Sequence, residues 1–218
     1  MTAGQQQQQP PPPPPPPPLP APSAIKVIVA DVDGTLLDSS HRLPLTSPTH
    51  RVLRRIRSQH PQLPIVVSTG KQHRSTAQLR ELLDLHAFPC CHLNGNVVYS
   101  SSPSGGEEGA PEAAAGRILC ESGLEADVVG AVLREMAAAN TTLFVYDHTT
   151  VYQLFRGHGD AGQWARLLRS YGELVVDDRD DLVEAVARGD IRAVKMAICQ
   201  EPETIHGMYI PHPAATEG

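Results

Sequence analysis

Residues 25–38 read IKVIVADVDGTLLD, and this stretch decides the fold class. Its first six residues are mostly apolar and β-branched, and the character changes abruptly at Asp31. An apolar run of this length that is closed by a polar turn is typical of a strand buried on both faces in a parallel sheet. We therefore predict a strand over residues 25–30, with Asp31 at its carboxyl end.

The same alternation continues along the first half of the chain. An apolar stripe predicts a helix over residues 48–59. Strands and helices that alternate at this spacing indicate an α/β fold with a parallel sheet. Ligands bind such sheets at the carboxyl ends of the strands, and Asp31, Thr69 and Asn94 fall at or just beyond such ends. The other predicted elements are a strand over residues 64–70, a helix over 75–85, and a third strand with a turn over 90–98.

The pattern changes after residue 117, where hairpin-like strands are followed by helices and a small α+β domain is predicted. The Gln- and Pro-rich start of the chain favours extended polyproline geometry, because it has almost nothing apolar to bury. We expect a disordered leader (residues 1–23), the first part of a core domain (24–116), the α+β domain (117–199) and an irregular tail (200–218). Within the α+β domain the predicted strands are 143–146, 151–155 and 193–198, and the predicted helices are 124–139, 162–170 and 181–188.

Two carboxylates stand two residues apart at the end of the first predicted strand. Asp31 can act as a nucleophile toward phosphorus, and Asp33 can protonate the leaving oxygen and later activate water. Gly34 allows a sharp turn, so that loop amides and the Thr35 hydroxyl can face phosphoryl oxygens. The two acids also offer the oxygen ligands that Mg²⁺ prefers. The alternative is an Asp-Gly turn with a capping aspartate after a core strand.

The segment DVDGTLLD at residues 31–38 resembles motif I of the haloacid dehalogenase (HAD) superfamily. This resemblance implies an α/β fold of the HAD-like Rossmannoid type, built on a parallel sheet. It implies that Asp31 is the phosphate-accepting nucleophile and Asp33 its acid/base partner. Mg²⁺ is the implied cofactor, with Asp31 and Asp33 as its ligands, and Gly34 and Thr35 are implied to bind the phosphate.

Two further segments resemble the Cof-type branch, subclass IIB, of the same superfamily. Residues 65–71 (IVVSTGK) are similar to its motif II and imply that Thr69, Gly70 and Lys71 hold the phosphate, with lysine where arginine is usual. A helix-capping turn is the alternative for this pattern alone. Residues 93–99 (LNGNVVY) resemble the turn before the cap of that subclass and imply that Asn94 contacts substrate; an ordinary Asn-Gly turn is the equal alternative.

The subclass inserts an α+β cap (C2B type) after the third strand, and residues 118–200 resemble such a cap. Motif III, which supplies a lysine, and motif IV, which completes the Mg²⁺ site, follow the cap in this subclass. Residues 200–218 show neither motif, and residues 174–181 (LVVDDRDD) fit acids at a helix N-terminus, since residues 155–173 contain no lysine. We therefore expect an incomplete core sheet and a truncated chain without most of the family's transition-state stabilisation.

Composition excludes several function classes. A net charge of −6 without any Lys/Arg block argues against nucleic-acid binding, and no apolar run approaches the roughly 20 residues that span a bilayer. The chain begins with neither a signal nor a transit peptide pattern, and its four cysteines make no disulfide scaffold, so a cytoplasmic location is expected. His86, Cys90, Cys91 and His92 have metal-ligand composition, but their spacing fits no zinc site, and we interpret them as a strand with buried cysteines.

The resemblance predicts a Mg²⁺-dependent phosphomonoester hydrolase that acts on a small phosphorylated metabolite, such as a sugar phosphate, through an aspartyl-phosphate. One alternative is a phosphomutase-like transferase that uses the same intermediate. Another is a catalytically silent binding or regulatory protein. In that case the proline tract at residues 10–18 could dock SH3-, WW- or profilin-like grooves, although an inert, solvated leader is the simpler interpretation.

Overall fold

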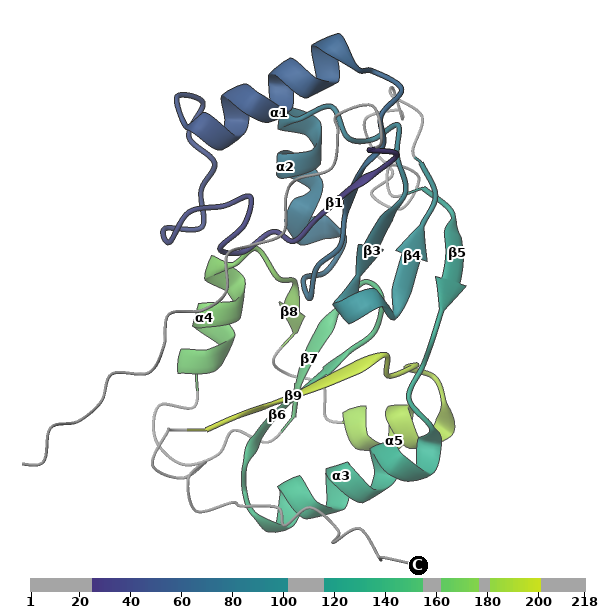
Figure 1. Ribbon diagram of the computed structural model, residues 1–218. Coiled ribbons are helices and arrows are strands. Elements are labelled where there is room, and N and C mark those ends of the chain that lie inside the picture. Colours follow the sequence, from purple (N-terminus) through teal and green to yellow (C-terminus); the bar gives the residue numbers. More distant parts are fainter. Residues whose placement is uncertain (1–24, 102–115, 155–161, 177–180, 201–218) are drawn as a thin grey trace, which may run out of the picture.

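The computed structural model describes residues 25–101, 116–154, 162–176 and 181–200, which build two sheet-containing units (Figure 1). In the first unit the predicted alternation of strands and helices is confirmed. β1 and β2 pair in parallel with Ala30 opposite Val67, and a parallel bridge from Ser68 to Cys91 places β3 next in order. The elements are β1 (Ile28–Ala30), α1 (Pro48–Gln59), β2 (Ile65–Val67), η2 (Arg74–Thr76), α2 (Ala77–Leu82), β3 (Cys90–His92), η3 (Leu93–Gly95), β4 (Val97–Tyr99) and β5 (Ile118–Glu121).

The predicted turn after β3 is η3, which reverses the chain. Asn94 adopts a left-handed backbone conformation with φ of 62°, and Gly95 follows with φ of 90°. Asparagine and glycine tolerate this region better than other residues. As a result β4 pairs antiparallel with β3, and β5 adds a further antiparallel strand beside β4. The sequence did not predict β5, whose pairing with β4 ties it to the sheet of the first unit.

The helix predicted over residues 48–59 is confirmed as α1. Ser47 caps its start, because the Ser47 hydroxyl accepts the His50 amide at 3.1 Å. Pro48 suits the first position of a helix, where an amide has no partner within the helix. Leu53 is buried and Val52 is exposed, so the apolar stripe is narrower than the sequence suggests.

Strand β1 corrects one prediction. The sequence predicts a strand buried on both faces, but Val29 is 62% exposed and its neighbours Ile28 and Ala30 are half-buried. Ile28 and Ala30 pack against the hydrophobic core, whereas neither core of the described residues includes Val29, which points to the opposite face. The prediction of burial on both faces is therefore wrong for β1, although the strand itself is present.

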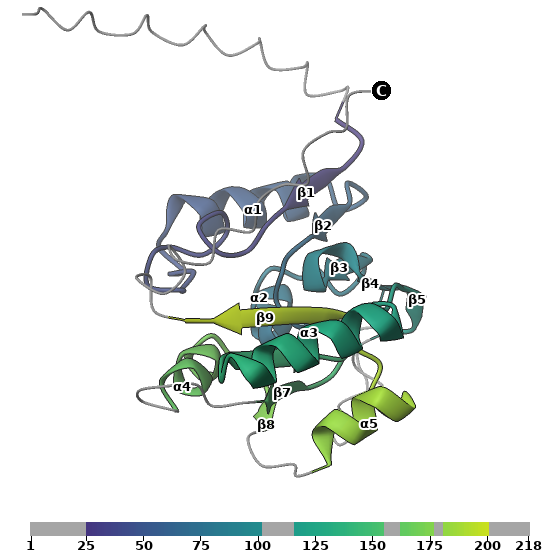
Figure 2. The same cartoon turned by 90° about the horizontal axis from the view of Figure 1, so that it is seen from below.

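The second unit is a four-stranded sheet in the order β8-β7-β6-β9 with helices beside it. In Figure 1, α3 and α5 lie together beyond this sheet, on the side away from the first unit, whereas α4 lies near β8. Figure 2 shows α3 running alongside β9. The elements are α3 (Ala126–Ala138), β6 (Thr142–Tyr146), β7 (Val151–Leu154), α4 (Gln163–Ser170), β8 (Val175–Val176), α5 (Leu182–Arg188) and β9 (Lys195–Cys199).

Strand β6 joins two hydrophobic cores, and all five of its residues are buried. Leu143 and Val145 point into the core formed with α3 and α5. Phe144 and Tyr146 point the other way, into a core that includes Ile65 and residues of the first unit. Successive side chains of a strand face opposite sides, so β6 contributes to both cores, and other residues of the second unit, among them Val151 and Val194, join it in the core shared with the first.

Several predictions lie outside the described residues. These are the leader with its proline tract, the tail beyond Gln200, most of the Ser- and Gly-rich stretch at 102–115, and the acids at 177–180. Among the described helices, none combines the length and hydrophobicity needed to span a membrane.

Candidate active site

The first predicted catalytic residue stands where strand order predicts it. Asp31 follows the last residue of β1, and the Ser68 amide donates to the Ala30 carbonyl at 2.9 Å. Ser68 in turn bridges Cys91 of β3. The ends of β1 and β2 therefore open at one edge of the sheet, with Asp31 level with the start of the Ser68–Thr69 turn.

The loop after β1 closes tightly on itself. Gly34 has φ of 72°, a conformation that side chains rarely adopt. The amides of Thr35, Leu36 and Leu37 all donate to the Val32 carbonyl, at 3.4, 3.0 and 2.9 Å. These three amides are engaged within the turn, contrary to the expectation that they face a phosphate, while Thr35 itself is exposed.

Asp38, the last residue of the motif, organises the next turn. Its carboxylate accepts the Ser40 hydroxyl at 2.6 Å, the Ser40 amide at 2.9 Å and the Arg42 amide at 3.1 Å. The hydrogen bond from Ser40 is the main cause that lowers the pKa of Asp38. This turn holds His41 at φ of 56° and directs its Nδ1 to Asp33, at 2.9 Å from Oδ1. The sequence did not predict a role for His41.

Asp33 and Lys71 come together from segments 38 residues apart. Lys71 Nζ lies 3.3 Å from Asp33 Oδ2 and 3.4 Å from Oδ1. Partial burial of Asp33 would raise its pKa, but the hydrogen bond from His41 and the charge of Lys71 outweigh this and lower the pKa of Asp33. The structure thus places the predicted acid/base residue beside the predicted phosphate-binding cation.

The turn after β2 is fixed to β3 by backbone hydrogen bonds. The Thr69 amide donates to the Cys91 carbonyl at 3.1 Å, and the Thr69 carbonyl accepts the Asn94 amide at 3.1 Å. The Lys71 carbonyl accepts the Leu93 amide at 3.2 Å. Thr69 and Lys71 are both buried, and the Thr69 hydroxyl accepts the Lys71 amide at 3.3 Å. The predicted phosphate-binding residues therefore sit on a rigid support.

Gly70 is enclosed by two side chains. A Cβ added at Gly70 would lie 2.6 Å from Asn94 Oδ1 and 3.7 Å from Lys195 Nζ. Lys195, on β9 of the second unit, donates to the Gly70 carbonyl at 2.9 Å. Burial lowers the pKa of Lys195, and the charge of Glu173 opposes this effect. Gly70 and Asn94, which were both predicted to lie near substrate, are therefore neighbours.

The second unit contributes two more groups that the sequence did not predict. The ring of Tyr171 lies 4.4 Å from the ring of His41 and 5.1 Å from Lys71 Nζ. The Glu173 carboxylate accepts the Ser75 hydroxyl at 2.9 Å. Burial raises the pKa of Glu173, although Ser75 and neighbouring cations oppose this. These contacts join residues 98 to 130 positions apart, and no local pattern in the sequence indicates them.

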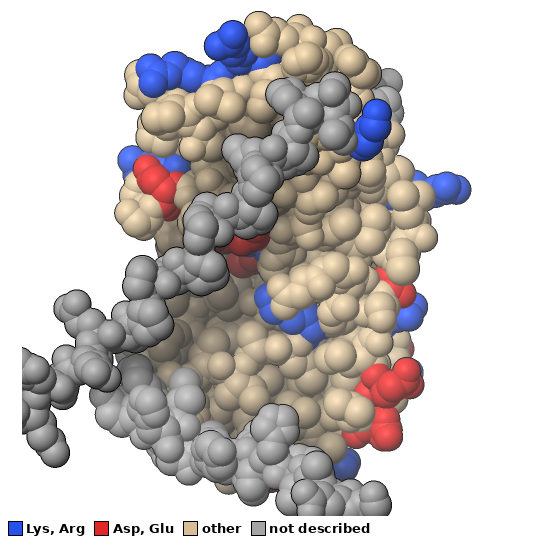
Figure 3. Space-filling view, viewed as in Figure 1, with Lys and Arg blue, Asp and Glu red and all other residues tan. Residues whose placement is uncertain are grey.

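Asp31 differs from Asp33 in its surroundings. Asp31 is exposed, and no hydrogen bond or ion pair engages its carboxylate among the residues that the structure describes. A free carboxylate can attack an electrophile or bind a hard cation. The carboxylate of Asp33 faces Lys71 and His41 instead, so it is the poorer of the two as a metal ligand. Figure 3 shows that the surface is hollowed between the two units, with acidic and basic side chains along the margin.

Comparisons of sequence relate this chain to known proteins. The family model for haloacid dehalogenase-like hydrolases matches residues 28–163. The uncharacterized hydrolase C25B8.12c of Schizosaccharomyces pombe is 34% identical over 190 residues, covering 86% of this chain and 57% of that protein. The chain spans about half the length of the curated relatives it matches.

Solved structures share the fold at low sequence identity. A haloacid dehalogenase-like hydrolase from Bacteroides thetaiotaomicron matches with a TM-score of 0.61 at 19% identity, over 84% of this chain and 60% of that one. The HAD subclass IIB sugar phosphatase BT4131 matches with a TM-score of 0.56 at 15% identity, over 84% of this chain and 61% of that one. At these identities the likeness concerns the fold alone.

Proposed function

The chain belongs to the haloacid dehalogenase-like hydrolase family, and on this premise we propose that it is built to hydrolyse a phosphate monoester at Asp31 and Asp33. The HAD-like α/β fold predicted from the sequence is confirmed by the solved structures. The observation that carries the proposal is the division between the two acids. Asp31 is exposed and unpartnered among the described residues, whereas Asp33 is held by Lys71 and His41.

In the proposed reaction a carboxylate oxygen of Asp31 attacks phosphorus and forms an acyl phosphate, while the bond from phosphorus to the leaving oxygen breaks. Asp33 gives its proton to that oxygen. Water then attacks phosphorus, Asp33 takes the water proton, and Asp31 is released with inorganic phosphate. The two acids divide the work as nucleophile and acid/base, which suits their different surroundings.

Lys71 gives Asp33 a way to acquire its proton at the right moment. In the absence of substrate, Lys71 and His41 keep the pKa of Asp33 low, which favours the carboxylate. A phosphate dianion that enters beside Thr69 attracts Lys71 away from Asp33. Loss of this cation raises the pKa of Asp33 and favours the protonated form that the first step needs. Substrate binding thus favours the protonated form of Asp33, which is the proposed general acid.

Mg²⁺ is the proposed cofactor, because the free Asp31 carboxylate is a hard oxygen donor of the kind that this ion prefers. When bound, such an ion neutralises phosphate charge and orients the phosphoryl group. Asp31 would hold it through a carboxylate oxygen. Asp33, the second proposed ligand, would hold it through its backbone carbonyl oxygen, because its carboxyl group must carry the proton. Gly34 and Thr35 line the turn beside this position, and Thr35 remains a proposed phosphate contact through its exposed hydroxyl.

The second unit is the proposed cap. Tyr171 and Lys195 extend from it to Lys71 and Gly70, and Glu173 is buried at the same junction. A polar set of this kind suits a small polar leaving group, such as a sugar, and Asn94 would contact it from the core side. The subclass IIB sugar phosphatase is the matched structure whose activity this proposal follows.

Turnover of an aryl phosphate by the full, untagged chain with Mg²⁺ tests the proposal. We expect hydrolysis that Asp31→Asn reduces by roughly 10³-fold or more, as for loss of a nucleophile. Asp127→Asn, on the exposed start of α3, is the matched control and should keep full activity. A wild-type chain without turnover, or an Asp31→Asn variant as active as wild type, would refute the proposal and favour a silent binding protein. Transfer of phosphate to a second substrate hydroxyl would instead favour the phosphomutase-like alternative.

A further inference from the structure

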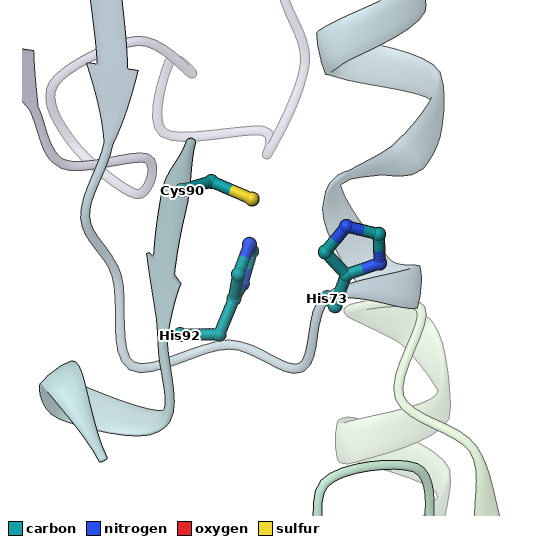
Figure 4. Close-up of side chains that lie close together, drawn as sticks. All are labelled: His73, Cys90 and His92. Atoms are coloured by element: carbon teal, nitrogen blue, oxygen red, sulfur yellow. The ribbon is translucent and has the colours of Figure 1, made fainter. Parts of the chain in front are cut away.

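A second cluster of reactive side chains lies on the inner side of the loop that carries Lys71. His73, at the end of this loop, meets Cys90 and His92 of β3, and all three residues are buried. Figure 4 shows the three side chains directed toward one another. Their candidate ligand atoms lie within 4.8 Å of one another. The sequence placed Cys90 and His92 on a strand but gave no sign that His73 would join them.

His92 is prepared to bind a ligand. Its Nδ1 faces the Lys71 carbonyl at 3.2 Å, and because a carbonyl only accepts, the proton of the ring must be on Nδ1. The lone pair on Nε2 is therefore free, and this atom is buried without a hydrogen-bond partner. A carbonyl that fixes the tautomer of a histidine in this way is typical of metal-binding histidines.

Both histidines are in the form that binds a metal ion, whereas Cys90 must lose its proton when an ion binds. Burial lowers the pKa of His73 to about 3 and that of His92 to about 4, so both rings are neutral at pH 7. Cys90 is a buried thiol, whose pKa burial raises. Two neutral imidazoles and one thiol form a ligand set that suits borderline-soft divalent ions such as Zn²⁺.

A cation already lies within this cluster. The guanidinium group of Arg80 contacts His73 Nε2 and Cys90 Sγ, the latter at 3.0 Å, and reaches His86 Nδ1 at 3.2 Å. Among the described residues no carboxylate pairs with Arg80, and its Nε is buried without a hydrogen-bond partner. Burying an unpaired charge is costly. The nitrogen and sulfur atoms of the cluster thus already face a cation, but no anion among the described residues balances its charge.

We propose that His73, Cys90 and His92 form a binding site for a borderline-soft divalent metal ion, of which Zn²⁺ is the natural example, and that Arg80 withdraws when the ion binds. Cys90 loses its proton to solvent as the sulfur–metal bond forms, and the nitrogen lone pairs of the two rings complete the protein's share of the ligands. Arg80 can leave toward His86, which is only partly buried and which the guanidinium group already contacts.

A metal ion at this site would connect the Thr69–His73 loop to β3 on the buried side of the loop. His73 is two residues beyond Lys71, and His92 already holds the Lys71 carbonyl. Metal binding would therefore stabilise the segment that presents Lys71, at a distance from the acids Asp31 and Asp33. The site shares no residue with the proposed hydrolytic site, and its ligands are nitrogen and sulfur rather than oxygen.

Cobalt(II) titration of the untagged full chain, dialysed first against a chelator, tests the site. We expect one equivalent of Co²⁺ to produce a thiolate-to-cobalt charge-transfer band in the near ultraviolet, and Zn²⁺ to displace it and raise the melting temperature. Cys90→Ser should abolish the band. Cys91→Ser is the matched control, because Cys91 is the next residue of the same strand and faces the other side, and it should keep the band.

Arg80→Met offers a second, independent measurement. Removal of the competing cation should tighten Co²⁺ binding at least tenfold. A wild-type chain without the band would overturn the proposal, whatever the variants do. A band that survives Cys90→Ser, or that disappears equally in Cys91→Ser, would also overturn it. The wild-type titration can overturn the proposal without any variant, so the test remains valid even if Cys90→Ser folds poorly.

Discussion

The loop from Thr69 to His73 has two sides of opposite electrostatic character. On its outer side the buried Lys71 faces Asp33 at 3.3 Å, so a cation meets an anion that is itself partly exposed. On its inner side Arg80 lies among His73, Cys90 and His92, which are all neutral, and the whole set is buried. The outer pair can exchange partners with a substrate at little cost because water is near. The inner set holds the Arg80 cation, which only neutral groups surround. One side of the loop can therefore respond to substrate, whereas the other side buries an unpaired charge.

The largest expected effect concerns the outer side. Lys71→Met should lower kcat/KM for an aryl phosphate by about 100-fold or more, as for loss of one charge-stabilising group worth roughly 3 kcal/mol. The same change should raise the pKa of Asp33, because it removes one of the groups that lower this pKa. Steady-state kinetics and a ¹³C NMR titration of the Asp33 carboxyl measure the two effects separately.

Lys26→Met, at an exposed position before β1, is the control for loss of a positive charge. It should leave both the rate and the Asp33 titration unchanged. If the Asp33 titration is the same in Lys71→Met and wild type, Lys71 does not lower the pKa of Asp33. Substrate binding then cannot raise this pKa by drawing Lys71 away.

The next effect concerns the inner side and acid stability. The folded chain binds a proton on His73 and His92 only near pH 3 and pH 4, whereas the unfolded chain does so near the ordinary value of 6.5. Below pH 6.5 the unfolded state therefore binds more protons, and stability falls as pH falls. At pH 5 each histidine should cost on the order of 2 kcal/mol relative to pH 7. Urea unfolding at a series of pH values, with chelator present, measures this loss.

Replacement of one ring sharpens the test. His92→Phe should remove about half of the pH dependence, because phenylalanine binds no proton. His60→Gln, at the exposed end of α1, should leave the dependence as it is. A wild-type chain that is equally stable at pH 7 and pH 5 would contradict the neutral, buried state of the two histidines.

The outer side was largely predictable from the sequence, and the inner side was not. Asp31, Asp33, Thr69 and Asn94 follow strand ends, and parallel strands bring such ends to one edge, so a local pattern was enough. His73 meets Cys90 and His92 only because the loop after β2 folds back over β3, which no periodicity reveals. Arg80 was equally hidden, since a basic residue on a short helix is normally exposed.

Two errors have the same physical origin. An apolar run predicts a strand, but the sequence alone does not tell what covers it, and Val29 proved to be exposed. Loop amides after Gly34 were expected to face a ligand, but the turn uses three of them for the Val32 carbonyl.

Tyr171, Glu173 and Lys195 reach the site across the junction of the two units, and such contacts depend on tertiary packing alone.

Gly70→Ala is the third prediction and should have a smaller effect. The added Cβ would lie 2.6 Å from Asn94 Oδ1, so the Asn94 side chain must move, and this end of a flexible, exposed side chain moves at little cost to stability. We expect a melting temperature close to that of wild type but a KM raised about tenfold, equivalent to about 1.4 kcal/mol, if Asn94 contacts substrate. Asn94→Ala should raise KM alike, and the double variant should be no worse than either single one. An additive double variant would show that Gly70 acts independently of Asn94.

The smallest predicted effect is at Tyr171, which contacts the outer side of the loop from the second unit. Its ring lies 5.1 Å from Lys71 Nζ, a distance at which a partly exposed cation–π contact contributes about 0.5–1 kcal/mol. Tyr171→Leu should therefore raise KM by about two- to fivefold, whereas Tyr171→Phe, which keeps the ring, should match wild type. Neither variant should alter the acid stability that depends on His73 and His92, because Tyr171 contacts neither of them. A change in acid stability in Tyr171→Leu would mean that the two sides of the loop are coupled through Lys71. The outer side, which exchanges partners with substrate, and the inner side, which holds the buried histidines, would then not act separately.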